Sequence, residues 1–211
     1  MSGKQRGARG GRRGPHATED VQRFHRWSRT YERSLGQAFF FGPVHGRVLE
    51  LVTAALDGRV PGDILDIGCG TGRLLRRIAT VWPAARLTGV DPADGMIRVA
   101  RTLTPGVTFF VGQGEAVPLP DSSVDIAFST VSFHHWQDQA AGVRDVARVL
   151  RPGGIFCLAD IRVPAALAWL KARRRVHTST EMRELFGQAG LTVLRQAGMR
   201  VGAILATVGK K

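Results

Sequence analysis

Short apolar runs alternate with stretches of helical periodicity through the middle of the chain. The helical stretches have apolar residues at offsets of three and four, which is typical of amphipathic helices. They are Leu74–Trp82, Met96–Ala100 and Ala140–Leu150, the last ended by Arg151-Pro152-Gly153-Gly154. The short runs, predicted as strands, are Ile64–Ile67, Arg86–Val90, Val107–Val111, Val124–Ser129 and Ile155–Ala159. Because each run is nearly all apolar, the pattern predicts a parallel sheet covered on both faces.

The pattern changes toward both ends of the chain. An aromatic helical stripe from Phe24 to Ala38 precedes a second helix, Val44–Ala55, and a Gly42-Pro43 break separates the two. After residue 160 a short helix with Met182 and Ala189 leads into two apolar runs. These runs are Leu191–Leu194 and Val201–Val208, separated by a short turn that contains Ala197-Gly198. Strands joined so tightly must be antiparallel, because a parallel return needs a crossover of about a dozen residues or more.

These elements predict an α/β fold of the Rossmann-like, doubly wound type. The sheet has seven strands and is mostly parallel, with a C-terminal antiparallel hairpin. We expect a disordered basic Gly/Arg tail over residues 1–20 and a single domain over residues 21–211. Within that domain, residues 21–60 form a helical cap and residues 161–177 a short lid segment.

Composition excludes several classes of protein. Of 211 residues, 44% are hydrophobic and two are cysteines, which excludes a wholly disordered chain and a disulfide scaffold. No uninterrupted apolar run approaches the roughly 20 residues of a membrane span, and the N-terminus lacks an apolar signal core. We therefore expect a soluble, cytoplasmic protein.

The net charge of +13 favours a nucleic-acid partner only until its distribution is considered. Eleven of these charges belong to residues 1–16 of the N-terminal tail, the C-terminal Lys210-Lys211 pair and a basic stretch with Lys171 and Arg173–Arg175. The body of the domain is nearly neutral. An anionic partner would therefore contact the tails or the lid segment.

A glycine-rich loop follows the first predicted strand. Asp66-Ile67-Gly68-Cys69-Gly70-Thr71-Gly72 stands where doubly wound folds bind ligands, and Asp91 follows the second strand. A carboxylate at that place accepts hydrogen bonds from ribose hydroxyls. Dinucleotide sites have a third glycine where this chain has Arg73, and Asp66 favours a positively charged ligand. S-adenosylmethionine is a nucleoside of that kind.

Four ordered segments carry a family resemblance: ILDIGCGTG, GVDPADGM, GQGEAVPLPDSSVDIAFSTVSFHHW and LRPGGIF. Together with the terminal hairpin they resemble the class I S-adenosylmethionine-dependent methyltransferases, and most of all the ubiquinone/menaquinone-type and other small-molecule enzymes. The resemblance spans about residues 44–160.

The resemblance implies a set of cofactor-binding residues. Asp66, Gly68, Cys69 and Gly70 would line the methionine portion, and Gly72 would open the next helix. Asp91 would hold the ribose. The remaining positions are Pro92 and Met96 beside the adenine, Gln113, Gly114 and Glu115 near its amino group, and Ser129 with Thr130 under the sulfonium. Gln113 stands where relatives often have Asp, and its amide oxygen accepts the same hydrogen bond.

Candidates for chemistry are fewer. Methyl transfer needs a general base only when the acceptor must lose a proton. Candidate groups are His134 and Tyr31, with His135 and His45 as further candidates, and a structural role for the two adjacent histidines is the simpler interpretation. We expect no metal ion. Cys69 and Cys157 stand in the loop and in a strand, which does not suit a cysteine nucleophile.

Three hypotheses for function remain open from the sequence. The first, which we favour, is methyl transfer to a small hydrophobic or aromatic molecule, suggested by the aromatic N-terminal segment and the apolar lid. The second is an RNA methyltransferase anchored by the basic tail, whose binding would depend steeply on salt. The third is a module that binds S-adenosylmethionine without catalysis. The oligomeric state and the acceptor atom are not indicated by the sequence.

Overall fold

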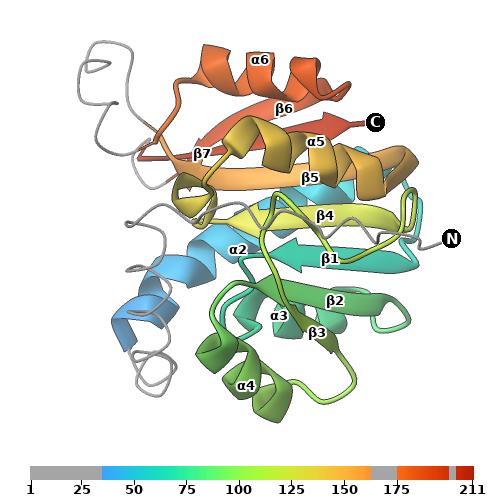
Figure 1. Ribbon diagram of the computed structural model, residues 1–211, viewed down its shortest axis with the longest axis vertical. Helices are drawn as coiled ribbons and strands as arrows, with labels where there is room; N and C mark the ends of the chain where they lie inside the picture. Colours follow the sequence, from blue (N-terminus) through green and yellow to red (C-terminus); the bar gives the residue numbers. More distant parts are fainter. Residues whose placement is uncertain (1–34, 163–174, 200–202) are drawn as a thin grey trace, which may run out of the picture.

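The computed structural model describes residues 35–162, 175–199 and 203–211. It contains a seven-stranded sheet of order β3-β2-β1-β4-β5-β7-β6 (Figure 1). The strands are β1 (Asp63–Ile67), β2 (Arg86–Asp91), β3 (Thr108–Val111), β4 (Val124–Thr130), β5 (Leu150–Ile161), β6 (Thr192–Met199) and β7 (Ile204–Lys210). The pairs from β3 to β5 are parallel, and β7 pairs antiparallel with both β5 and β6. The predicted fold class is confirmed.

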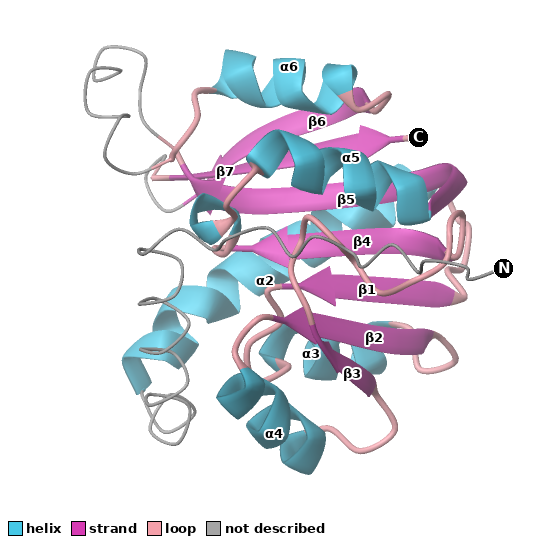
Figure 2. Cartoon of the chain, in the orientation of Figure 1, coloured by secondary structure: helices cyan, strands magenta, loops and turns pink. Residues whose placement is uncertain are grey.

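Helices cover both faces of the sheet (Figure 2). One face packs against α2 (Leu35–Leu56), α3 (Arg73–Val81) and α4 (Asp94–Leu103), and the other against α5 (Gln139–Val149) and α6 (Ser179–Gln188). A short 3-10 turn, η1 (Phe133–His135), follows β4. Successive residues of β1 serve opposite cores, because Ile64 packs with α2 and α3 whereas Leu65 packs with α5. Two apolar cores therefore hold the carboxyl ends of β1, β2 and β4 at one edge of the sheet.

The expected break at Gly42-Pro43 is wrong, because α2 continues through Pro43. Proline weakens a helix by removing one N–H group and crowding the preceding turn. Here Val44, Val48 and Val52 are fully buried against the sheet, and Arg77 Nη1 donates to the carbonyl of Gly42 at 2.5 Å. Packing of the helix that follows the proline therefore outweighs the local signal.

The same helix contains an 18-residue segment, Phe39–Leu56, that is long and apolar enough to cross a membrane, with a mean hydropathy of 1.2. Core helices of globular domains pass the same test. In this structure the segment packs on β5 and β7 through its buried valines and leucines. The core therefore accounts for these buried residues, whereas Phe39 and Phe40 at the start of the segment are exposed.

The predicted turn at Arg151-Pro152-Gly153-Gly154 lies inside β5 as an irregularity of the strand. Val124 pairs with Leu150 and Ile126 with Ile155, so four residues of β5 face one residue of β4. Gly153 adopts a φ of +78°, which glycine reaches without the steric cost of a side chain. The bulge lets β5 continue where the sequence pattern predicts a separate turn.

The C-terminal hairpin is present, but the turn is not at Ala197-Gly198. These residues lie within β6, where Ala197 pairs with Ala206 and Gly198 with Leu205. The connection between the strands falls at 200–203, of which 200–202 lie outside the described residues. Gly198 is therefore a residue of the antiparallel strand and does not mark the turn.

Three predicted features lie largely or wholly outside the described residues. They are the basic tail (1–20), the first part of the helical cap (21–34) with Tyr31, and the central part of the lid segment (163–174).

Candidate functional site

A cavity opens at the carboxyl ends of β1, β2 and β4, beneath the first half of α2. Its floor is the glycine loop. The N–H groups of Gly68 and Cys69 both donate to Val90 O, at 2.8 and 3.1 Å, which ties the loop to β2. Gly68 has a φ of +72°, and a Cβ added there would lie 2.2 Å from Ser132 Oγ. Only glycine fits at this position, so the backbone itself forms that part of the cavity floor.

Asp91 ends β2 and points into the loop. Its Oδ2 accepts the N–H of Gly70 at 2.9 Å, and its Oδ1 accepts the N–H of Ala93 at 2.8 Å. Burial raises the pKa of this carboxyl to about 6, although both backbone bonds favour the ionised form. Each carboxylate oxygen has a second lone pair, so Asp91 still has the capacity to accept two ligand hydroxyls.

Asp66 is a buried carboxyl near the end of β1 that faces the cavity. Its side chain lines the cavity and is 1% exposed, and Oδ1 has no hydrogen-bond partner. Burial, reinforced by the nearby charge of Asp91, raises the pKa of Asp66 to about 8. A buried carboxylate without a partner is costly, and a cationic ligand relieves that cost. The site therefore favours positive charge beside Asp66.

The adenine side of the predicted site follows β3. Glu115 Oε1 accepts the N–H groups of Gln137 and Asp138, at 2.5 and 3.1 Å, so this carboxylate fixes the segment after η1. A Cβ on Gly114 would lie 2.6 Å from the ring of Trp136. Gly114 thus lets the segment after β3 lie against the indole, and both segments line the cavity.

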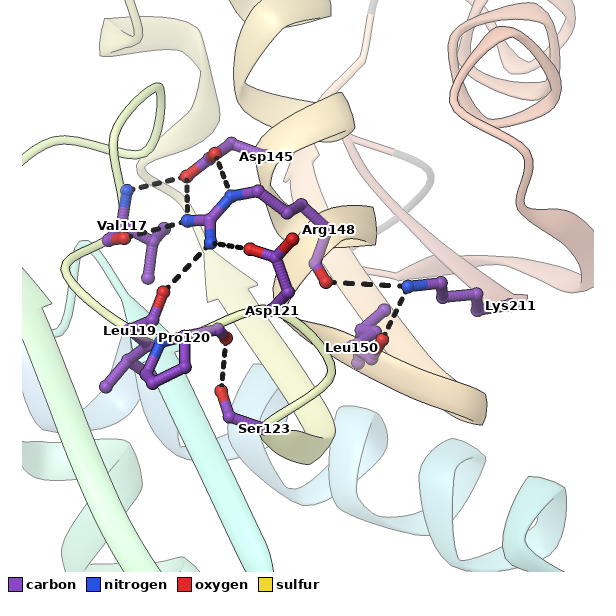
Figure 3. A network of polar contacts seen from close by, with 9 residues as sticks. All are labelled: Val117, Leu119, Pro120, Asp121, Ser123, Asp145, Arg148, Leu150 and Lys211. Carbon is purple, nitrogen blue, oxygen red and sulfur yellow. Dashed lines mark hydrogen bonds and ion pairs between the residues drawn. The ribbon is translucent and has the colours of Figure 1, made fainter.

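The loop beyond Glu115 is held by a network around Arg148 of α5 (Figure 3). The guanidinium donates to the carbonyls of Val117 and Leu119 and to the carboxylates of Asp121 and Asp145. Asp145 also accepts the N–H of Val117 at 2.7 Å. The hydrogen bonds that Arg148 donates to both carboxylates raise its pKa, so the guanidinium stays charged. Sequence patterns gave no indication of this clamp, because Asp121, Leu119 and Val117 are 27 to 31 residues from Arg148 along the chain, and only Asp145 is close, at three residues.

Ten of the twelve predicted cofactor residues line this one cavity: Asp66, Gly68, Cys69, Gly70, Asp91, Pro92, Met96, Gln113, Gly114 and Glu115. Gly72 does not, because it caps α3 and packs against Phe109. Ser129 is fully buried and shares a 2.9 Å hydrogen bond with Ser132, which does line the cavity. Thr130, also expected there, is a lining residue.

Sequence reasoning did not identify several lining residues. Thr71, Arg73, Ala93 and Gly112 are neighbours of predicted positions, and proximity along the chain could have found them. The others come from α2 and from the segment around η1, namely Phe41, Val131, Ser132, Trp136 and Gln137. Tertiary packing alone brings these to the loop.

The two adjacent histidines have different surroundings. His134 lies outside the cavity lining, and its Nδ1 is 2.7 Å from Asp160 Oδ1 while its N–H donates to Asp160 Oδ2 at 3.0 Å. His135 lines the cavity, with its ring centroid 4.0 Å from that of His134. Tyr31, the other catalytic candidate, lies outside the described residues. Of the two histidines, the structure places His135 at the site.

Cys69 lines the cavity, and its thiol is not primed for nucleophilic attack. Burial, followed by the charges of Asp91 and Asp66, raises the pKa of Cys69 well above its usual value. A thiol with a raised pKa stays protonated and unreactive. This agrees with the expectation that neither cysteine is a nucleophile.

Comparison with known protein families gives a match over this part of the chain. A family model described as a methyltransferase domain matches residues 65–158. Malonyl-[acyl-carrier protein] O-methyltransferase of Methylococcus capsulatus is 38% identical over 100 residues, 46% of this chain and 36% of that protein. The enzyme of the same name from Dechloromonas aromatica is 30% identical over 82% of this chain and 65% of its own length. Demethylmenaquinone methyltransferase of Chlorobaculum tepidum is 32% identical over 52% of this chain and 45% of its own length. The chain therefore spans about a third to two thirds of these relatives.

Solved structures share the fold at lower identity. A SAM-dependent methyltransferase from Aquifex aeolicus superposes with a TM-score of 0.62 at 18% identity, covering 77% of this chain and 88% of that one. The [4+2]-cyclase SpnF superposes with a TM-score of 0.68 at 19% identity, covering 78% of this chain and 80% of that one. The second protein is named for a different reaction. Similarity of fold alone therefore does not decide chemistry.

Proposed function

We propose that this chain, which belongs to the class I S-adenosylmethionine-dependent methyltransferase family, transfers a methyl group from that cofactor to a small hydrophobic or aromatic molecule. The observation that carries the proposal is the buried carboxyl of Asp66, whose Oδ1 has no hydrogen-bond partner, in a cavity that also presents Asp91. A phosphate-bearing dinucleotide would be repelled by ionised Asp91 and would leave Asp66 without a partner of opposite charge. A nucleoside with a cationic sulfur and an ammonium group is attracted.

The residues present fit this cofactor. Asp91 would hold the ribose through the free lone pairs of its two oxygens, and Asp66 would face the cationic amino-acid end. Met96 and Pro92 line the part of the cavity that the family resemblance assigns to adenine. When bound, the cofactor supplies a methyl group on positively charged sulfur, and the leaving group is a neutral thioether. The task of the protein is then to align the acceptor with that methyl group and exclude water.

The acceptor proposal is supported by the apolar part of the cavity wall. Phe41, Val131 and Trp136 line it, and Phe41 belongs to the aromatic stretch at the start of α2. Apolar and aromatic walls with few polar groups are typical of sites for small molecules. One of the relatives, a demethylmenaquinone methyltransferase, is named for an acceptor of this kind, whereas others are named for malonyl-[acyl-carrier protein].

An acceptor hydroxyl or phenol must lose a proton during transfer. His135 is the imidazole on the cavity wall, and we propose it in place of His134 as the group that takes this proton. His134, fixed by Asp160, would then support the ring of His135 from behind. Replacing His135 by Ala should preserve cofactor affinity and lower turnover by about a hundredfold. The matched variant His134→Ala should have a smaller effect on turnover.

Two experiments test the proposed function. Calorimetric titration with S-adenosylmethionine should show binding by the wild type, and absence of binding would refute the cofactor assignment. Transfer of a labelled methyl group to fractionated metabolites, lipids and RNA should then label the small-molecule fraction. Labelling of RNA alone would replace the acceptor proposal with the RNA hypothesis. Binding without transfer to any fraction would favour a non-catalytic module.

A further inference from the structure

The start of α2 presents aromatic side chains to solvent. Phe39 is 76% exposed and Phe40 is 36% exposed. The other large apolar side chains that are exposed in the described part of the chain, among them Val60 and Leu194, are aliphatic and belong to separate parts of the fold. Scattered exposed aliphatic residues are ordinary on a protein surface, whereas a group of exposed apolar side chains marks a contact surface. The start of α2 is therefore a candidate for such a surface.

Helical spacing gathers the exposed residues on one face of α2. Residues three and four apart are neighbours on a helix, so Phe39 and Phe40 both lie beside Pro43, which is also exposed. We call these three residues the aromatic face of α2. Residues 35–46 include no Asp, Glu, Lys or Arg, so no charged side chain from this part of the helix interrupts the face. The start of α2 also projects beyond the carboxyl ends of β1 and β4 (Figure 1).

The aromatic face is continuous with the wall of the cavity. The ring of Phe40 packs edge-on against that of Phe41, with centroids 5.1 Å apart. Phe41 in turn lines the cavity, whereas Phe39 and Phe40 do not. An apolar molecule held at the aromatic face therefore meets Phe41 as the next surface on its way into the cavity.

Positive charge accompanies the aromatic face. The 34 residues that precede α2 contain nine Lys and Arg against three Asp and Glu, and the chain enters the helix at this end. Within the described part, the exposed Arg77 of α3 donates to Gly42 O at 2.5 Å, which fixes a guanidinium beside the face. Aromatic side chains next to cations suit an anionic bilayer, because the rings enter the headgroup region and the cations meet lipid phosphates. A second copy of this chain is a poorer occupant, since a two-fold contact here would bring the two basic segments together.

The same helix does not have its whole length available to a membrane. Phe39–Leu56 is long and apolar enough to span a bilayer, but Val48, Val52 and Leu56 are buried in the core against the sheet. A spanning helix would have to withdraw these side chains from the core, at a cost that burial in lipid only replaces. Contact through the start of the helix keeps the core intact. The structure therefore favours a helix that lies on the surface of a bilayer over one that crosses it.

We propose that the aromatic face of α2 docks this protein on an anionic membrane surface and brings the cavity close to the boundary between lipid and water. Docking itself does not require methyl transfer. Its consequence for the acceptor rests on the proposed function: a hydrophobic acceptor dissolved in the bilayer would reach the cavity past Phe41 without crossing water.

Co-sedimentation of the full chain with lipid vesicles tests the proposal. The wild type should bind vesicles of equimolar phosphatidylcholine and phosphatidylglycerol, and should bind vesicles of phosphatidylcholine alone more weakly. The double substitution Phe39→Ser/Phe40→Ser should lower the partition coefficient on the mixed vesicles by about tenfold or more, because two aromatic side chains no longer leave water. Neither residue lines the cavity, so calorimetry should give this variant the affinity of the wild type for S-adenosylmethionine.

Val60→Ser is the matched control. Val60 is 79% exposed and follows the opposite end of α2, so this variant should bind the mixed vesicles as the wild type does. Phe39→Trp and Val60→Trp then report which end of the helix meets lipid. Brominated phosphatidylcholine in the vesicles should quench the fluorescence of the indole added at position 39 and spare the one at position 60. Thermal unfolding of each variant verifies that it is folded.

Three outcomes would overturn the inference, independently of the proposed function. Absence of vesicle binding by the wild type refutes docking, whatever calorimetry shows for S-adenosylmethionine. If Phe39→Ser/Phe40→Ser binds the mixed vesicles as tightly as the wild type, charge alone holds the lipid and the aromatic face has no part in docking. If the wild type ignores vesicles and forms a dimer in sedimentation equilibrium that the double substitution dissociates, the face is a contact between copies. Conversely, vesicle binding with the expected loss, but no binding of S-adenosylmethionine, would establish docking and refute the proposed function.

Discussion

Strand β1 carries an aspartate near each end, and the two have opposite environments. Asp63, at the start of the strand, accepts hydrogen bonds from Arg86 at 2.6 and 2.7 Å. It also forms an ion pair with Arg151 at 2.9 Å. Burial alone would raise the pKa of Asp63, but these two arginines outweigh it and the pKa is lowered. Asp66, at the cavity end, has an oxygen without a partner and a raised pKa.

The two edges of the sheet differ in whether their buried charges are compensated within the chain. At the amino edge of β1, Asp125 joins Arg151 to the N–H groups of Gly62 and Asp63, so every charge in this cluster is compensated within the chain. At the carboxyl edge, burial disfavours the ionised form of both Asp66 and Asp91, and the charge of Asp91 further disfavours ionisation of Asp66. Uncompensated buried charge costs stability and creates affinity for a ligand of opposite sign. One edge therefore stabilises the fold, and the other is poised for a cationic ligand.

The largest expected effect is loss of cofactor affinity on removing Asp91. Asp91→Ala deletes the proposed ribose acceptors and the bond that fixes Gly70, so affinity for S-adenosylmethionine should fall by roughly a hundredfold or more. Calorimetric titration measures it.

Asp125→Ala is the matched control from the opposite edge, since Asp125 also accepts two backbone N–H groups. It should lower the free energy of unfolding by about 1–3 kcal/mol and leave cofactor affinity unchanged. A similar loss of affinity in both variants would contradict the division of roles between the edges.

The second expected effect is on stability as a function of pH. The carboxyl of Asp66 has a pKa of 3.8 when unperturbed and about 8 in the folded protein. The folded state therefore holds a proton that the unfolded state releases, and Asp66 removes stability progressively as pH rises from about 4 to 8. Asp66→Asn should abolish this loss and be more stable than the wild type at pH 8 by on the order of a few kcal/mol.

For Asp63 we expect the opposite dependence of folding stability on pH. Its lowered pKa means that Asp63 adds stability above pH 3.8 and loses it as pH falls through the folded value. Asp63→Asn should therefore be less stable than the wild type at neutral pH and approach it in acid. Thermal unfolding from about pH 2 to pH 8 tests both variants, and parallel curves for the two would refute the assignment.

The third expected effect is release of a proton from Asp66 when a cationic ligand binds. If a cationic ligand stabilises ionised Asp66, binding releases a proton, so affinity should rise between pH 6 and pH 7.5. Calorimetry in two buffers of different ionisation enthalpy measures the number of protons released. In Asp66→Asn the release should decrease and the overall affinity should fall. An unchanged proton count in that variant would assign the release to another group.

Local sequence signals predicted most of the fold, and they failed where tertiary pairing overrides them. Glycine and proline mark turns in general, yet Gly198 lies in a paired strand and Pro43 lies within a helix. Register with β7 and burial of Val44 and Val48 supply the free energy that decides these places. Neither contribution is visible in a short window of sequence.

In the candidate site, too, local sequence signals predicted some residues and missed those that tertiary packing brings together. Residues contiguous with the glycine loop were identified, because the loop conformation and the acidic residue after the next strand have local signatures. Phe41, Trp136 and Gln137 were missed, since packing of α2 and the bond from Gln137 to Glu115 bring them there. Ser129 was expected at the cavity, but it points into the protein and bonds Ser132 instead.

The smallest expected effect is the loss of stability in a variant at the amino edge of β1. Arg151 pairs with both Asp63 and Asp125 at 2.9 Å, but its side chain is 37% exposed and solvent screens these ion pairs. Arg151→Ala should lower the free energy of unfolding by about 1 kcal/mol or less, and salt should reduce the difference from the wild type. Urea unfolding at low and high salt measures both quantities. Cofactor affinity should stay unchanged, because the cluster lies at the edge of the sheet away from the cavity. A loss of affinity in Arg151→Ala would show that the two edges are coupled through β1, and the separation argued above would then be wrong.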